Sequence, residues 1–148
     1  VLIVDEAQNL TADALESLRM LSNINADKDQ LLQIILVGQP QLRDLLRRPE
    51  LTQFFQRVSV DFFIPPLEDF EVEKYINHRL LIAGRDTPLF TPVAIKQIAS
   101  TTRGIPRSIN ILCDTALVYG FSTGADKIDV GLIREVIKDR NDFGVLGS

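Results

Sequence analysis

The feature that most constrains the fold is a run of four apolar residues, VLIV at positions 1–4, that ends at Asp5 and Glu6. Such a short, continuously apolar and β-branched run is typical of a strand buried in a parallel sheet. The carboxyl ends of these strands form the edge where open α/β folds bind ligands. The sequence therefore predicts two carboxylates at that edge, although a strand that simply ends in two solvated acids fits the same pattern.

The remainder of the first 64 residues alternates between helix and strand patterns. Thr11 is expected to cap a helix that runs to Ile24, and a polar loop follows at 25–29. The apolar run LLQIILV at 31–37 predicts a second buried strand, and a short helix is expected at 41–46. Residues 58–62 are the candidate for a third strand. This order predicts a parallel α/β sheet.

After Pro65 and Pro66 the sequence predicts helices only. Four helices are expected, at 68–83, 91–100, 106–119 and 129–138. Gly84 and Gly120 are expected to end the first and the third, and Thr91 with Pro92 to begin the second. The chain is therefore expected to contain an α/β part at 1–64 and an all-helical part at 65–148.

Composition excludes several classes of protein. The 148 residues are 45% hydrophobic, which supports a packed core, and no apolar run approaches the roughly 20 residues of a membrane helix. A net charge of −4 argues against binding nucleic acid through a basic surface. One cysteine and one histidine exclude an internal disulfide and a histidine-rich metal cluster, and they favour a reducing compartment.

Three further polar residues are candidates for a site at the sheet edge. Gln39 follows the second strand, so parallel pairing would bring it beside Asp5 and Glu6. Arg57 precedes the third strand candidate and could stabilise charge on a transferring phosphoryl group. Arg107 occupies the first turn of a helix, where the helix dipole disfavours a cation, so it suggests an external anion. Polar turns and solvated arginines remain the structural alternatives.

Six segments together resemble the AAA+ ATPases of the general secretion pathway protein A type. They are VLIVDEAQNL (1–10), LRMLSN (18–23), LLQIILVGQPQLR (31–43), PPLEDFE (65–71), YINHRLLIAG (75–84) and GIPRSINILCDTALVYG (104–120). The resemblance implies a partial P-loop NTPase sheet followed by a helical lid. It implies that Asp5 and Glu6 form the Walker B motif, with Asp5 near Mg²⁺ and Glu6 polarising water. It also implies Gln39 as sensor 1, Arg57 as an arginine finger and Arg107 as sensor 2.

The same resemblance implies a biological setting. ATP and Mg²⁺ would bind where the core meets the lid, and a finger that acts across a subunit interface implies self-association. The family works at the cytoplasmic face of the inner membrane, with membrane components of type II secretion or related surface-assembly systems. Peptidoglycan would be contacted only through regions outside this sequence. The resemblance assigns no mechanistic role to Gln8 or Asn9.

One family motif is missing from the sequence. A P-loop requires G-x-x-x-x-G-K-[ST], and none of the eight glycines is followed by lysine. Only four residues precede Asp5, so we expect the chain to be a fragment of an ATPase that by itself neither binds ATP tightly nor hydrolyses it. Two alternatives remain open, a nucleic-acid-associated AAA+ protein of the transposition-helper type and a non-catalytic interaction module.

Overall fold

The computed structural model describes residues 1–21, 25–26, 29–30 and 32–142. It divides the chain into two compact units, Val1–Phe63 and Ile64–Ser148, which are described separately below. No helix among the described residues is long and apolar enough to cross a membrane.

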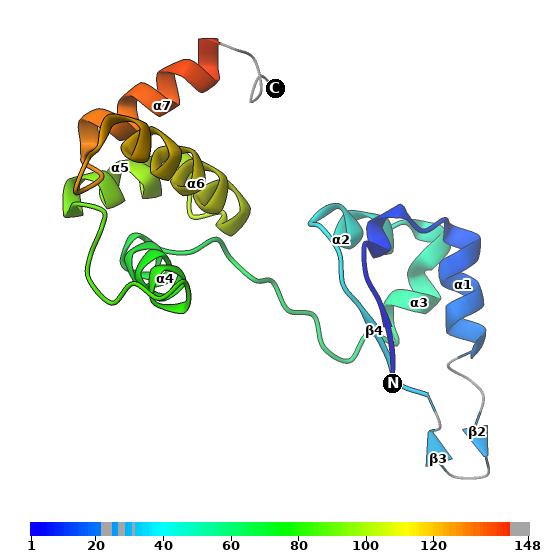
Figure 1. Ribbon diagram of the computed structural model, residues 1–148. Coiled ribbons are helices and arrows are strands. Elements are labelled where there is room, and N and C mark those ends of the chain that lie inside the picture. The colour runs from blue at the N-terminus through cyan, green and yellow to red at the C-terminus, as the bar shows by residue number, and fades with distance from the viewer. Residues whose placement is uncertain (22–24, 27–28, 31, 143–148) are drawn as a thin grey trace. The chain divides into compact units, whose positions relative to one another are not determined.

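The first unit is built around two parallel strands. Strand β1 (Leu2–Val4) pairs with β4 (Ile34–Leu36), with Leu2 opposite Ile34 and Val4 opposite Leu36. The predicted parallel pairing is therefore confirmed, with shorter strands than the apolar runs suggested. Helices α1 (Ala12–Leu21), α2 (Gln41–Leu46) and α3 (Thr52–Phe55) lie on one side of this pair (Figure 1). Two 3-10 turns, η1 (Ala7–Asn9) and η2 (Pro49–Leu51), connect these elements.

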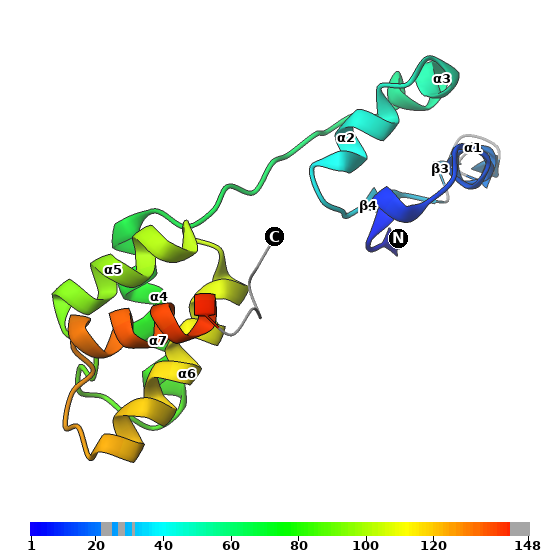
Figure 2. The same cartoon turned by 90° about the horizontal axis from the view of Figure 1, so that it is seen from above.

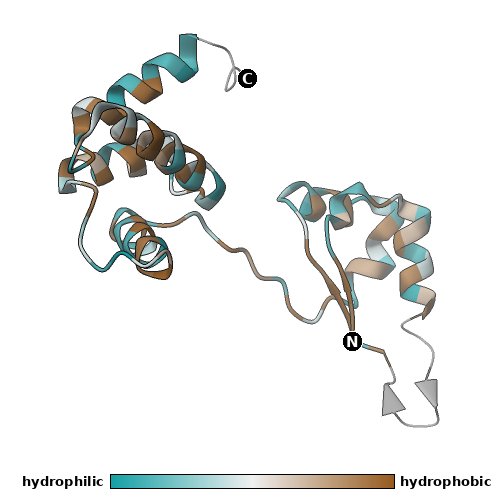
Figure 3. Cartoon of the chain, in the orientation of Figure 1, coloured by the Kyte–Doolittle hydropathy of each residue, from teal (hydrophilic) through white to brown (hydrophobic). Residues whose placement is uncertain are grey.

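The core of the first unit lies between the strands and these helices. Its buried residues are Ala7, Leu15, Leu42, Leu45, Leu46 and Leu51, and Val4 and Leu36 pack against them. The alternate strand residues Ile3 and Ile35 are 63% and 48% exposed. Parallel sheets are ordinarily covered on both faces. The unit therefore presents an apolar sheet face to solvent, and both strands are coloured as hydrophobic in Figure 3.

Two local predictions in the first unit were wrong. The loop expected at 25–29 instead contains the short antiparallel strands β2 (Asn25–Ala26) and β3 (Asp29–Gln30), the second of which extends one residue beyond it. Residues 58–62 form no strand, and the side chains of Val60 and Phe62 are 81% and 80% exposed. A strand needs a hydrogen-bonded neighbour, and in the described residues β1 and β4 pair only with each other. The expected end of α1 at Ile24 lies outside the described residues.

The second unit consists of four helices, α4 (Asp69–Ile82), α5 (Pro92–Thr102), α6 (Pro106–Thr123) and α7 (Val130–Asp142). Helix α7 packs on both α5 and α6, as Figures 1 and 2 show, and α4 packs on α5. The fully buried side chains at its centre include Ile98, Ile109, Ile128 and Ile133. The prediction of an all-helical part is confirmed.

The helix ends follow the expected chemistry with one exception. Thr91 caps α5 by accepting a hydrogen bond from the Ala94 amide, and Gly84 follows α4 with a left-handed φ of 88°. Helix α6, however, does not end at Gly120 but continues to Gly124, whose φ is 66°. A β-carbon at position 120 would lie 2.4 Å from Cδ1 of Ile128, so this glycine serves close packing instead.

Candidate functional site

The carboxyl ends of β1 and β4 lie side by side, as the sequence predicts. The Val37 amide donates to the Val4 carbonyl at 2.8 Å, and the Ala7 amide donates to the Val37 carbonyl at 2.9 Å. These two hydrogen bonds continue the ladder beyond the last strand residues. The loop that carries Asp5 and Glu6 is thereby fixed against the loop that carries Gln39.

The backbone turns sharply at Glu6, immediately after the strand. Glu6 has φ 52° and ψ 35°, the left-handed conformation that costs a residue with a β-carbon roughly 1–2 kcal/mol. Its amide donates to Oδ1 of Asp5 at 2.8 Å, and the 3-10 turn η1 begins at the next residue. Both acidic side chains are exposed at this edge. Strain held at such a point is typical of functional sites.

A glutamine that the sequence analysis left without a role joins the two loops. The Gln8 side-chain amide donates to Oε2 of Glu6 and accepts, through Oε1, the Gln39 amide at 3.0 Å. The structure therefore connects Glu6 to the loop of Gln39 through one side chain. The sequence analysis assigned no role to Gln8, because its contact with Gln39 spans 31 positions. The contact also depends on Gly38, since a β-carbon there would lie 2.6 Å from Oε1 of Gln8.

The two exposed carboxylates at this edge are ligands of the type that Mg²⁺ takes in proteins. Mg²⁺ is commonly held through one or two carboxylates, several waters and phosphate oxygens. Asp5 uses Oδ1 for the Glu6 amide, and its carboxylate has a second oxygen that can accept hydrogen bonds from metal-bound water. In the described residues no three acidic, histidine or cysteine side chains cluster as a metal site.

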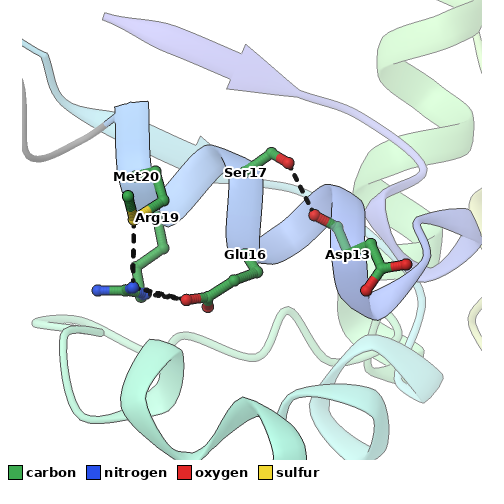
Figure 4. A network of polar contacts seen from close by, with 5 residues as sticks. All are labelled: Asp13, Glu16, Ser17, Arg19 and Met20. Carbon is green, nitrogen blue, oxygen red and sulfur yellow. Dashed lines mark hydrogen bonds and ion pairs between the residues drawn. The ribbon is translucent and has the colours of Figure 1, made fainter.

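Arg57 lies directly after α3, on a turn in which its amide donates to the Phe54 carbonyl at 3.0 Å. Its positive charge acts on Glu16 of α1. The pKa of Glu16 is lowered mainly by its hydrogen bond from Arg19, with a smaller contribution from the charge of Arg57. Figure 4 shows the Glu16 and Arg19 side chains meeting on α1. The structure thus places Arg57 beside α1.

After Arg57, the chain is held to α2 by a surface ion pair. Both Nε and one terminal nitrogen of Arg43 contact Oδ2 of Asp61, at 3.1 and 2.8 Å. Both side chains are substantially exposed, so the pair adds little stability. It is a contact between α2 and the segment in which a strand was expected.

Arg107 belongs to the second unit, in the first turn of α6. The loop before it contains two left-handed residues, Arg103 with φ 52° and Gly104 with φ 71°. The Leu67 amide donates to the Gly104 carbonyl at 2.9 Å. Among the ion pairs of the described residues, none involves Arg107.

The single cysteine and histidine are not part of a reactive group. Cys113 is buried in the core of the second unit, and burial, helped by the charge of Asp114, raises the pKa of its thiol to about 12. His78 is exposed on α4.

Two comparisons of the sequence with known proteins find similarity to an AAA domain and to a secretion pathway protein. A family model described as an AAA domain matches residues 1–46. General secretion pathway protein A of Aeromonas hydrophila is 41% identical over 151 residues, which cover 100% of this chain and 28% of that protein.

Solved structures agree at the level of the fold. Two mutants of RuvB from Thermotoga maritima match with TM-scores of 0.64 and 0.63, at 19% and 18% identity. Each match covers 94% of this chain and 44% of the RuvB chain. RuvB is an AAA+ ATPase, so the fold is that of a partial AAA+ domain. In sequence, this chain is similar to general secretion pathway protein A and, over residues 1–46, to the AAA domain family.

Proposed function

We propose that this chain supplies the Walker B carboxylates and the helical lid of an AAA+ ATPase that hydrolyses ATP to drive assembly or transport in a type II secretion or related system. One observation carries the proposal. The parallel pairing of β1 with β4 places Asp5, Glu6 and the loop of Gln39 at one sheet edge, linked by the hydrogen bonds of Gln8. This is the edge at which parallel α/β sheets bind their ligands.

Each residue at the edge has a distinct role in the proposed reaction. Asp5 would hold Mg²⁺, and the ion would supply positive charge to the phosphate oxygens. Glu6 accepts a hydrogen bond from the attacking water and orients it toward the γ-phosphate. The side chain of Gln39 donates a hydrogen bond to the γ-phosphate or to that water.

The two arginines act on the phosphates from other elements. Arg107 is proposed as sensor 2, a lid residue that contacts the nucleotide phosphates, which suits a cation left without an ion-pair partner in the described residues. Arg57 is proposed as an arginine finger that reaches the nucleotide of a neighbouring subunit. This role requires self-association of the ATPase domain.

The cellular setting is proposed from the similarity to general secretion pathway protein A. The chain spans 28% of the length of that relative, so partners and location concern a longer protein. In that protein the ATPase domain would lie at the cytoplasmic face of the inner membrane and act with membrane components of the secretion system. Contact with peptidoglycan would depend on other regions.

The proposal is tested by calorimetry with Mg-ATP on two proteins, this chain alone and a longer one that begins upstream and includes a P-loop. We expect tight binding only by the longer protein, since backbone amides of a P-loop cradle the phosphates. Replacing Asp5→Ala together with Glu6→Ala should abolish that binding. Tight binding by this chain alone would overturn the inactive-fragment proposal, and no binding by either would favour an interaction module.

Hydrolysis is then measured on the longer protein with Glu6→Gln. Loss of the carboxylate should lower kcat by roughly a hundredfold or more while ATP still binds, because the group acts on the attacking water. Glu73→Gln makes the same chemical change on an exposed residue of α4 and should leave kcat unchanged. Equal activity in Glu6→Gln and wild type would contradict the assignment of Glu6.

A further inference from the structure

Among the hydrogen bonds of the described residues, those of the Gln8 side chain connect the Glu6 carboxylate with the loop after β4. Its Nε2 donates to Oε2 of Glu6, and its Oε1 accepts the amide of Gln39 at 3.0 Å. Gln8 is half-buried, whereas Glu6 and Gln39 are exposed. The contact therefore holds an exposed carboxylate in place from its protein side.

The direction of the Gln8 amide is determined by chemistry. The backbone N–H of Gln39 can only donate, so it must face the oxygen of the Gln8 amide. The nitrogen then necessarily faces Glu6, where it donates to the carboxylate. A hydrogen bond to an ionised acceptor is stronger than one between neutral groups. The Gln39 amide thus presets the Gln8 side chain to donate its hydrogen bond to the Glu6 carboxylate.

Gly38 makes room for this arrangement. A β-carbon on residue 38 would lie 2.6 Å from Oε1 of Gln8, 3.1 Å from Cδ2 of Leu42 and 3.3 Å from the Gln8 backbone nitrogen. Its φ lies outside the left-handed range, so space and not backbone conformation is what position 38 requires. The Gly38→Ala substitution should therefore crowd the Gln8 side chain, and to a smaller degree Leu42, while it leaves the chemical groups of Gln8 and Glu6 unchanged.

We infer that Gln8 is a positioning residue for the proposed hydrolysis: it fixes the Glu6 carboxylate in register with the Gln39 loop, and Gly38 provides the space that it needs. The inference rests on the proposed function, because it concerns the residue assigned to orient water. In this role Gln8 contacts neither the nucleotide nor the attacking water, and it acts only through Glu6 and Gln39.

The contact itself is tested on this chain by hydrogen exchange. In Gln8→Met, which keeps the length of the side chain but removes both hydrogen bonds, the Gln39 amide should exchange about fivefold faster or more. Gly38→Ala should accelerate the same amide. Gln33→Met removes an exposed glutamine before β4, at the other end of the strand pair, and should leave Gln39 unchanged. Unchanged exchange in Gln8→Met would overturn the inference.

The consequence for catalysis is tested on the longer, P-loop-containing protein. Gln8→Met and Gly38→Ala should each lower kcat by roughly 10- to 100-fold with ATP affinity within about threefold of wild type, because a misplaced group loses rate before it loses binding. A purely structural role would weaken ATP binding and thermal stability together with kcat, and that result would contradict the inference.

A double-mutant cycle separates this inference from the proposed function. When Glu6→Gln has already removed the carboxylate, adding Gln8→Met should lower kcat by no more than about twofold further. Additive losses would show that Gln8 does not act through Glu6. If Glu6→Gln alone leaves kcat unchanged, the proposed function fails; if only the Gln8 variants are without effect, the inference fails and the proposed function stands.

Discussion

The substitution Gly104→Ala is expected to destabilise the second unit far more than the same change at Gly84 or Gly124. Gly84, Gly104 and Gly124 all have left-handed φ angles, of 88°, 71° and 66°. At positions 84 and 124 a β-carbon would meet nothing within 4 Å, whereas at position 104 it would lie 2.0 Å from the Leu67 carbonyl oxygen. The three positions therefore share the conformational cost and differ in the steric one.

The magnitude follows from adding these costs. The left-handed conformation of an alanine costs roughly 1–2 kcal/mol at each of the three positions. Overlap with a backbone oxygen cannot be relieved by rotating a side chain, and overpacking of this kind costs about 1–3 kcal/mol. Separating the two segments also removes the hydrogen bond from the Leu67 amide to the Gly104 carbonyl, worth about 1 kcal/mol. Gly104→Ala should therefore lower the free energy of unfolding by roughly 3–6 kcal/mol.

The sequence provides an assay that reports on this unit alone. The chain has two tyrosines and no tryptophan, and Tyr75 and Tyr119 both lie in the second unit. Each hydroxyl is hydrogen-bonded, to Asn110 at 3.0 Å and to Asp139 at 2.8 Å, so tyrosine fluorescence changes when the unit unfolds. Urea titration followed by this signal gives the unfolding midpoint without interference from the first unit.

With an m value of about 1 kcal/mol per molar urea, Gly84→Ala and Gly124→Ala should lower the midpoint by about 1–2 M. Gly104→Ala should lower it by at least about 3 M or leave the unit unfolded in buffer. Gly104→Ala with a midpoint equal to that of Gly84→Ala would refute the reasoning. It would mean that the Leu67 segment moves away from the loop at no cost.

Two further predictions concern titratable groups of the second unit. Because burial raises the pKa of the Cys113 thiol to about 12, the native protein at pH 8 should react with a thiol reagent at least a hundredfold more slowly than in urea, and rapid native labelling would contradict the buried placement. The hydrogen bond to Asp139, with smaller effects of desolvation and nearby carboxylates, raises the pKa of Tyr119 above its ordinary value near 10. The stability that comes from this shift is complete below about pH 10 and is lost as the pH rises through the higher pKa of the folded state. Tyr119→Phe should therefore flatten the alkaline decline of the urea unfolding midpoint. An unchanged decline would count against the contact with Asp139.

Much of the fold was predictable because its signals are local. The α2 boundaries match because a proline precedes that helix, and α5 begins where Thr91 and Pro92 indicate. Such caps act within one turn, so they can be recognised from a few neighbouring residues.

The errors concern interactions with distant parts of the chain. Residues 58–62 have the composition of a strand, but a strand forms only when a second strand pairs with it. The composition of the segment does not determine whether such a partner is present, and in the described residues it has none. Gly120 resembles a helix end, yet its real constraint is the side chain of Ile128 on a later segment. Tertiary contact overrides local propensity in both cases.

In the candidate site, too, some features could be predicted from the sequence and others depend on contacts between distant residues. Asp5, Glu6 and Gln39 could be placed at one edge because parallel pairing alone brings strand ends together. The role of Gln8 could not be predicted, since it depends on a side-chain contact across 31 positions and on the missing β-carbon of Gly38.

The left-handed backbone at Glu6 has a consequence for how related sequences change over generations. Glycine and asparagine adopt this backbone more easily than glutamate does, so a lineage under no pressure to keep the carboxylate gains stability by replacing it. With Glu6 in its proposed role, selection for stability and selection for activity therefore act on position 6 in opposite directions. Under that proposal, glycine or asparagine at this position should mark relatives that have stopped hydrolysing nucleotide.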